Sequence, residues 1–187
     1  MRRRGFSLTE LLVSVALLGL VVGGASALSI AGLRRYANTQ ADVDATQEAT
    51  LGAQTVVEAV RQAVSVQIQD GGFRLAYELP ALAPSIDPTT GERELADPLR
   101  SDGVPRSFYV SGDRLIDGAT GRVVAEGLTT VDPDPASTQY GQTVAPFQLT
   151  TIGSRRAITV NLIGRVDTPS GRRYARFKTT FIVRNVQ

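Results

Sequence analysis

A long apolar run near the N-terminus constrains this chain more than any other feature. Leu11 to Leu33 spans 23 residues and contains no charged side chain. At the helical rise of about 1.5 Å per residue the run is roughly 35 Å long, which is enough to cross a hydrocarbon core of about 30 Å. The basic stretch Arg2 to Arg4 precedes it, and basic flanks tend to stay in the cytoplasm. We therefore predict a single-pass membrane protein with a cytoplasmic N-terminus and a C-terminal domain outside the cytoplasm.

A secretory signal peptide is the competing interpretation of this segment. Ala25-Ser26-Ala27 fits a cleavage site, and cleavage after Ala27 would release a soluble binding or adhesin-like domain. Glu10 argues against that interpretation. A carboxylate in the apolar region opposes insertion by about 2.5 to 3.5 kcal/mol near the bilayer centre, and by less near its edge.

The residues around this carboxylate resemble a known processing signal. Gly5-Phe6-Ser7-Leu8-Thr9-Glu10, followed by the apolar helix, is similar to the type III signal of type IV pilins and type II secretion pseudopilins. The resemblance implies cleavage between Gly5 and Phe6 by a prepilin peptidase, N-methylation of Phe6, and a role for Glu10 in assembly. It also implies four kinds of partner: the prepilin peptidase, other major and minor pilin or pseudopilin subunits, an inner-membrane assembly platform, and membrane lipid.

A physical argument gives Glu10 a purpose in such an assembly. When the N-terminal helices of several subunits form an apolar bundle, an unpaired ammonium group on Phe6 is costly to bury. The carboxylate of Glu10 from a neighbouring subunit can pair with that ammonium group. The pair would then fix the axial position of one subunit against the next.

The apolar run continues into a segment with one apolar stripe. Residues at near-helical spacing form this stripe, which comprises Leu51, Ala53, Val57, Val60, Val64 and Ile68. We predict that residues 34–69 continue the transmembrane and assembly helix of residues 6–33 as an amphipathic helix. The stripe should pack on a sheet. Residues 1–5, before these two helical segments, are the predicted leader peptide.

Residues 70–187 are expected to form a globular antiparallel β domain. Five prolines punctuate residues 78–106, which predicts a long surface loop. From Ser107 onward the apolar period changes to two, and Thr168-Pro169-Ser170-Gly171 joins two alternating runs in a predicted hairpin. The fold class is therefore α+β, with the long helix packed on a C-terminal antiparallel sheet.

A second and looser resemblance concerns this domain. It comprises a tyrosine-containing strand, the turn Gly112-Asp113-Arg114-Leu115, the segment Ala125-Glu126-Gly127-Leu128, and a closing strand that ends in Arg184-Asn185. This order is similar to that of larger minor pilins and J-type pseudopilins. The resemblance implies a place near the filament tip, in an initiating complex.

Composition removes several other functions. The chain has no cysteine and no histidine, which excludes Ser-His-Asp and Cys-His catalysis and the usual zinc ligands. No activated nucleophile or paired-carboxylate motif is recognisable, and the acidic residues match no EF-hand spacing. We therefore predict no catalytic residue, metal site or cofactor. An extracellular enzyme is the third and weakest alternative.

The basic residues suggest one further partner, DNA. Three of the 20 basic residues lie in the leader, and the remaining 17 face 18 acidic residues, so no global basic field remains. Two basic pairs at predicted hairpin ends are nevertheless candidate phosphate contacts. They are Arg155 with Arg156, and Arg172 with Arg173. Ordinary solubilising turn arginines are the alternative interpretation, and we consider it the stronger one.

Overall fold

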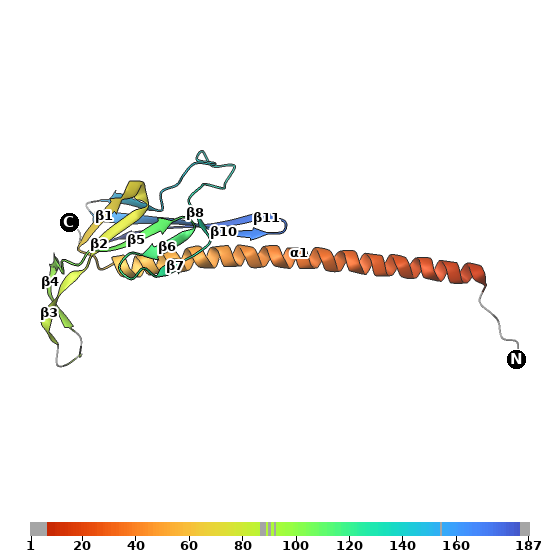
Figure 1. The fold of residues 1–187 in the computed structure, drawn as a ribbon, viewed down its shortest axis with the longest axis horizontal. Coiled ribbons are helices and arrows are strands. Elements are labelled where there is room, and N and C mark those ends of the chain that lie inside the picture. The colour runs from red at the N-terminus through yellow and green to blue at the C-terminus, as the bar shows by residue number, and fades with distance from the viewer. Residues whose placement is uncertain (1–6, 87–88, 90, 92, 154, 184–187) are drawn as a thin grey trace. The chain divides into compact units, whose positions relative to one another are not determined.

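The computed structural model describes residues 7–86, 89, 91, 93–153 and 155–183. The chain divides into two compact units, residues 1–40 and 41–187. The secondary-structure elements are, in order, α1 (Leu8–Val60), β1 (Ser65–Gln69), η1 (Asp70–Gly72), β2 (Arg74–Glu78), β3 (Pro80–Ile86), β4 (Arg93–Ser101), β5 (Arg106–Ser111), β6 (Arg114–Asp117), β7 (Val123–Ala125), β8 (Leu128–Thr129), β9 (Phe147–Ile152), β10 (Arg155–Thr168) and β11 (Gly171–Ile182). These elements confirm the α+β class (Figure 1).

The described part of the N-terminal unit is almost entirely helical. From Leu8 the backbone stays helical through all the glycines of the apolar run. The large apolar side chains between Leu8 and Leu33 are each more than half exposed. By length and composition α1 can cross a membrane, although a signal sequence meets the same criterion. An exposed surface of this kind requires an apolar environment, either lipid or neighbouring helices.

Two antiparallel sheets form the core of the second unit, and a third, two-stranded sheet is described below. The first has the strand order β1-β2-β5-β6-β7, and the second has the order β11-β10-β8, with β9 also paired to β10. The long hairpin of β10 and β11 is in continuous register from the Thr168–Gly171 pair to the Ala157–Ile182 pair. The hydroxyl of Thr168 donates to the carbonyl of Gly171 at 2.6 Å and closes the turn. This confirms the hairpin that the alternation predicts.

The part of α1 within the second unit packs on these sheets through small side chains. Its buried residues are Ala41, Ala45, Ala49, Gly52, Ala53, Val56 and Val60. Gly164 of β10 lies so close to the helix that an added Cβ would collide with the carbonyl oxygen of Ala45. The stripe predicted from the sequence is only partly correct, because Ala53 and Val60 are buried whereas Leu51 is 47% exposed. Close contact with a sheet favours alanine and glycine over bulkier side chains.

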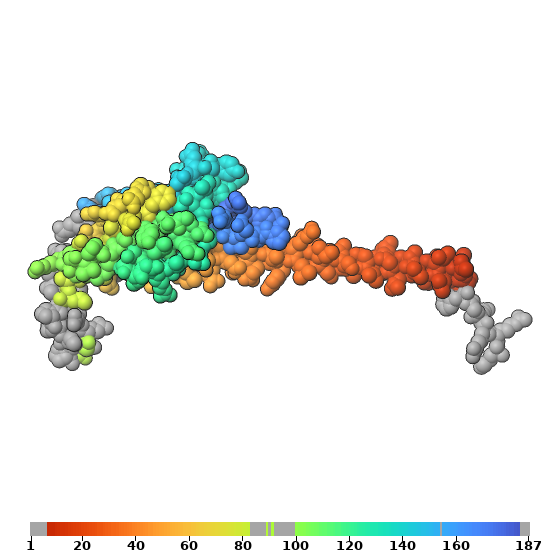
Figure 2. Space-filling view, in the orientation of Figure 1, coloured from red at the N-terminus to blue at the C-terminus, as the bar shows by residue number. Residues whose placement is uncertain are grey.

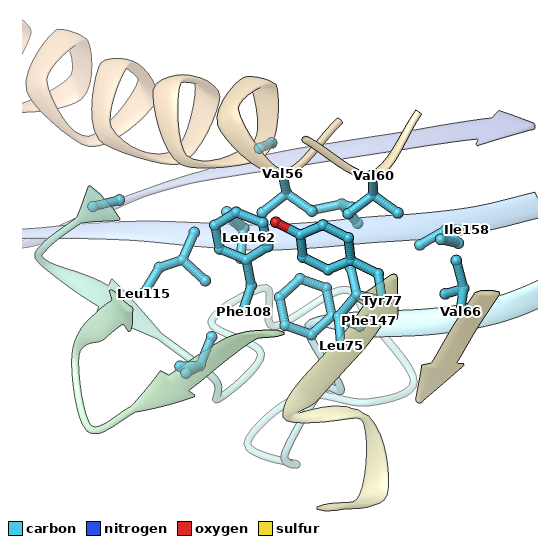
Figure 3. Packing of buried hydrophobic residues seen from close by; sticks show 14 of the residues in the cluster. Val56, Val60, Val66, Leu75, Tyr77, Phe108, Leu115, Phe147, Ile158 and Leu162 are labelled. Carbon is cyan, nitrogen blue, oxygen red and sulfur yellow. The ribbon is translucent and has the colours of Figure 1, made fainter. Parts of the chain in front are cut away.

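Large side chains from the strands fill the core beneath the C-terminal end of α1 (Figure 3). Val56 and Val60 of α1 meet Phe108 and Tyr77, whose rings are stacked with centroids 5.7 Å apart. Phe147 at the start of β9 is completely buried among them. One continuous cluster thus joins the helix to both sheets.

The helix ends earlier than the sequence predicts. It stops at Val60, and residues 65–69 form β1, which pairs with β2 from Ser65–Glu78 to Gln69–Arg74. The alternation of Val64, Val66 and Ile68 fits a strand as well as it fits one helical stripe, and β-branched residues favour strands.

The predicted loop over residues 78–106 is wrong. This region contains β3 and β4, which form a separate two-stranded sheet. Prolines are tolerated there because both strands are edge strands, so an N–H group missing on the outer side costs no ladder hydrogen bond. The three shifts of register between Pro80 and Ile86 show how irregular the pairing is.

Candidate assembly and docking sites

The first candidate site is the N-terminal end of α1. Ser7 caps the helix: its hydroxyl accepts from the N–H of Glu10 at 3.3 Å, and the Glu10 carboxylate accepts from the N–H of Ser7 at 3.1 Å. These reciprocal bonds form a capping box, which satisfies two N–H groups that a helix terminus otherwise leaves unpaired. The spacing Ser-x-x-Glu is the sequence signal of this motif.

The capping box gives Glu10 a structural role within its own chain. The carboxylate also lies at the positive end of the helix dipole, where a negative charge is favourable. Its side chain is exposed, so a second partner can still approach it. Gly5 and Phe6, the predicted processing residues, lie outside the described residues. Ala27, after which a signal peptidase would cut, lies within the unbroken helix α1.

The structure does not bring the two basic pairs together. Arg155 and Arg156 begin β10, whereas Arg172 and Arg173 pair with Asp167 and Val166 at the other end of the same hairpin. At about 3.4 Å per residue, the ten or more residues of strand between the pairs separate them by roughly 35 Å. Residues within each pair also point to opposite faces of the sheet. DNA contact stays a prediction, but the four arginines form no single patch.

A surface groove lies beside one of these pairs. It has a volume of about 400 Å³ and is lined by Asp42 of α1, by Pro133 and Asp134, and by Arg172, Arg173, Tyr174 and Arg176 of β11. Arg172 forms an exposed ion pair with Asp167 at 3.3 Å. Arg173 forms no ion pair with any residue in the described part of the chain. Cationic and anionic side chains therefore share this groove.

A buried carboxylate fixes one wall of the groove. Asp132 is 1% exposed, and its carboxylate accepts from Arg176 at 2.7 Å, from the N–H of Asp134 at 3.0 Å and from the hydroxyl of Ser137 at 2.8 Å. These donors, Arg176 foremost, lower the pKa of Asp132 to about 2. Asp132 thereby ties the loop of residues 132–142, called here the Asp132 loop, to β11.

The N-terminal segment matches one family model. Residues 1–26 match the model described as the prokaryotic N-terminal methylation motif. The chain carries the N-terminal signature of type IV pilins and pseudopilins. The search of curated proteins and the search of solved structures found no match.

This signature supports a pilin-like protein that is processed by prepilin peptidase, and together with the long apolar helix it fits a membrane-anchored pilin. The motif implies, in general terms, that the partners include this peptidase and other pilin subunits. The matched segment includes Glu10 and the first part of α1. Among the described residues of this pilin-like protein, no group of three or more acidic residues is arranged to hold a metal ion.

Proposed function

We propose that this pilin-like protein is a minor subunit of a type IV pilus or of a type II secretion-like pseudopilus, acting in the priming or tip complex. In this proposal its N-terminal helix joins the subunit to its neighbours, and its β domain is presented outside the inner membrane. Its role is one of assembly, without catalysis.

The observation that carries assembly through the helix is the position of Glu10. Glu10 is the only charged residue between the predicted cleavage point and Arg34, and it lies in the first turn of α1, directly before the apolar run. Cleavage before Phe6 creates an ammonium group next to the capping Ser7. A carboxylate from a neighbouring helix is the group that offsets the cost of burying that ammonium group.

The orientation follows from the charge flanking the apolar run. Arg2 to Arg4 precede it and favour a cytoplasmic N-terminus, as expected for a segment that a peptidase removes on that side. The second unit, residues 41–187, then lies on the far side of the membrane. Assembly platform proteins and the prepilin peptidase would meet the chain at its N-terminal end.

Two features support the minor role. The described part of α1 contains no proline, although many major pilins have one in the membrane half of this helix. The order of motifs in the β domain is similar to that of J-type pseudopilins. The motif Gly112 to Leu115 spans the turn between β5 and β6, and the motif Ala125 to Leu128 spans the connection between β7 and β8.

The first experiment is an intact mass measurement on the protein from the membrane fraction of its native host. We expect a species that begins at Phe6, with or without one added methyl group. A soluble species that begins at Leu28 would instead establish cleavage after Ala27 and remove the assembly role. A species that retains residues 1–5 would contradict processing at Gly5.

A set of three variants then separates the two roles of Glu10. Glu10→Gln keeps an oxygen acceptor for the Ser7 N–H, since glutamine also serves in capping boxes, but removes the charge. Glu10→Ala removes both, and Ser7→Ala removes the hydroxyl cap at a cost of about 1 kcal/mol.

We expect Glu10→Gln and Glu10→Ala to be processed normally and to be lost from filaments, whereas Ser7→Ala should enter them. Incorporation is measured by the amount of each variant in sheared filament fractions relative to the membrane pool. If Glu10→Gln enters filaments as well as the parent does, capping and not charge pairing is the function of this residue.

A further inference from the structure

Strand β11 presents a long free edge. All of its 12 residues pair with β10, and β10 carries β8 and β9 on its other side. Within the described residues, no backbone hydrogen bond joins β11 to any segment other than β10. A free edge of this length leaves a row of N–H and C=O groups that another extended segment can pair with. Figure 2 shows the hairpin (blue) at the surface, beside the teal segment near residue 140.

The two faces of β11 can be assigned from its register. Gly164 approaches α1, and Gly164 pairs with Ala175, so Ala175 faces the helix. Because side chains alternate along a strand, Arg173 also faces the helix side. Arg172, Tyr174 and Arg176 face the opposite side, where Arg176 meets the Asp132 loop.

The groove described above contains residues from both of these faces. Arg173 and Asp42 line it on the helix side, and Arg172, Tyr174 and Arg176 line it together with Pro133 and Asp134 on the other side. A hollow that consecutive residues of one strand line from both faces must run along the edge of that strand. Since the edge towards β10 is occupied, the groove follows the free edge of β11.

The charges along β11 indicate the chemistry of an occupant. The strand has four cationic residues and no carboxylate: Arg172, Arg173, Arg176 and Lys178. Arg172 and Arg176 are paired with Asp167 and Asp132, whereas Arg173 and Lys178 have no ion-pair partner among the described residues. These two unpaired cations are five positions apart and therefore lie on opposite faces of the strand.

A polypeptide strand fits this arrangement better than a nucleic acid does. Asp42 and Asp134 line the same groove, and two of the arginines already have carboxylate partners. A nucleic acid carries a negative phosphate at every nucleotide and therefore meets more repulsion there than a peptide with only two carboxylates does. An added strand needs carboxylates only beside Arg173 and beside Lys178. In such a strand the two acidic residues are also five positions apart, one on each face.

We propose that the free edge of β11 binds an extended segment of another polypeptide by strand addition, and that this segment carries two carboxylates five positions apart. Main-chain hydrogen bonds to β11 provide the affinity, and the two ion pairs set the register of the added strand. This docking site lies in the second unit, so it is tested apart from the N-terminal helix and from filament assembly.

The test uses the full chain in detergent and short synthetic peptides of alternating threonine and valine. The first peptide carries two glutamates five positions apart. The second carries them four positions apart, which places both on one face, and the third has glutamines in place of the glutamates. A single-stranded oligonucleotide of similar length is the fourth probe. The readout is amide-resolved hydrogen exchange of β11 at saturating probe.

We expect the first peptide to slow exchange at every second amide of β11, because only alternate N–H groups point away from β10. It should bind about tenfold more tightly than the glutamine peptide, and more tightly than the peptide with the shorter spacing. Reversing both charges in Arg173→Glu with Lys178→Glu should remove this preference, whereas Arg155→Glu, at the other end of the hairpin, should retain it.

Three results would overturn the proposal. They are unchanged exchange of β11 with the first peptide, equal binding of all three peptides, and protection of β11 by the oligonucleotide alone. If the doubly reversed variant does not fold, as judged by circular dichroism, the four probes on the parent protein still decide the question.

Discussion

Replacing Gly164 with alanine tests how closely α1 and β10 approach. The added Cβ would collide with the backbone carbonyl oxygen of Ala45, and it would lie 2.8 Å from the carbonyl carbon and 3.1 Å from the Cα of the same residue. All three atoms belong to the backbone of a helix, so no side-chain rotation can relieve the contact. The helix and the strand must therefore move apart, which opens the packed face that contains Ala41 and Ala49.

The magnitude follows from two opposing effects. Overpacking a tight core costs 1 to 3 kcal/mol, and a collision with backbone places this substitution at about 3 kcal/mol. Alanine in a strand regains about 1 kcal/mol, because glycine loses more conformational freedom on folding. We therefore expect a net loss of about 2 kcal/mol. For a folded unit of this size, that loss lowers the melting temperature by about 4 to 8 °C.

Thermal unfolding of the full chain in detergent measures this effect. The near-ultraviolet circular dichroism of tyrosine reports mainly on the β domain, since four of the five tyrosines lie in residues 70–187 and the chain has no tryptophan. A melting temperature within about 1 °C of the parent would refute the close approach. The double variant Gly164→Ala with Ala45→Gly gives an internal check. It should regain no stability, because the obstacle is the carbonyl group and not the methyl group of Ala45.

Two further substitutions test the core and the buried ion pair. Phe147→Ala removes a completely buried ring and should cost about 3 to 5 kcal/mol, measured by urea unfolding, whereas a loss below about 1 kcal/mol would contradict the assigned burial. Asp132→Asn should destabilise the domain at neutral pH and flatten its acid unfolding. The pKa of Asp132 is about 2 in the folded chain and near 4 when unfolded, so its contribution is fully present above pH ~5 and is lost as the pH falls from about 4 to about 2. The urea midpoints of parent and variant should therefore converge over that interval, and a constant difference down to about pH 2 would show that the carboxylate is not held by Arg176.

The sequence predicts the helix and the final hairpin well because each carries one unambiguous period. Leu11 to Leu33 can only be an apolar helix, and the alternation along β10 and β11 fits only a strand. Residues 64–68 fit both periods, so local pattern could not locate the end of α1. The prolines of residues 78–106 indicated a loop because proline is excluded from central strands. Both β3 and β4 are edge strands, where proline is tolerated.

The candidate sites also differ in whether local sequence is enough to predict them. Glu10 stands out in the sequence because a lone charge in an apolar helix requires a reason, and its capping partner lies only three residues away. The groove beside β11 could not be predicted, because Asp42, Asp134 and Arg173 meet only after the helix, the Asp132 loop and the hairpin have folded together. The arginine pairs were visible in the sequence, but their separation depends on the full length of the hairpin.

The small-residue face of α1 also determines how the domain is positioned along its own helix. Ala41, Ala45, Ala49 and Ala53 repeat every four residues, so a slide of four residues puts another alanine in the place of Ala41, Ala45 and Ala49. These alanines alone therefore do not fix the axial position of the helix on the sheets. Val56 makes the selection, because a slide that carries it into the place of Gly52 meets Ala125, whose Cβ lies only 2.9 Å from a Cβ built there. A pulling force along the helix would therefore be resisted mainly by a few contacts near its C-terminal end. The alanine contacts over the rest of the interface would resist axial sliding only weakly.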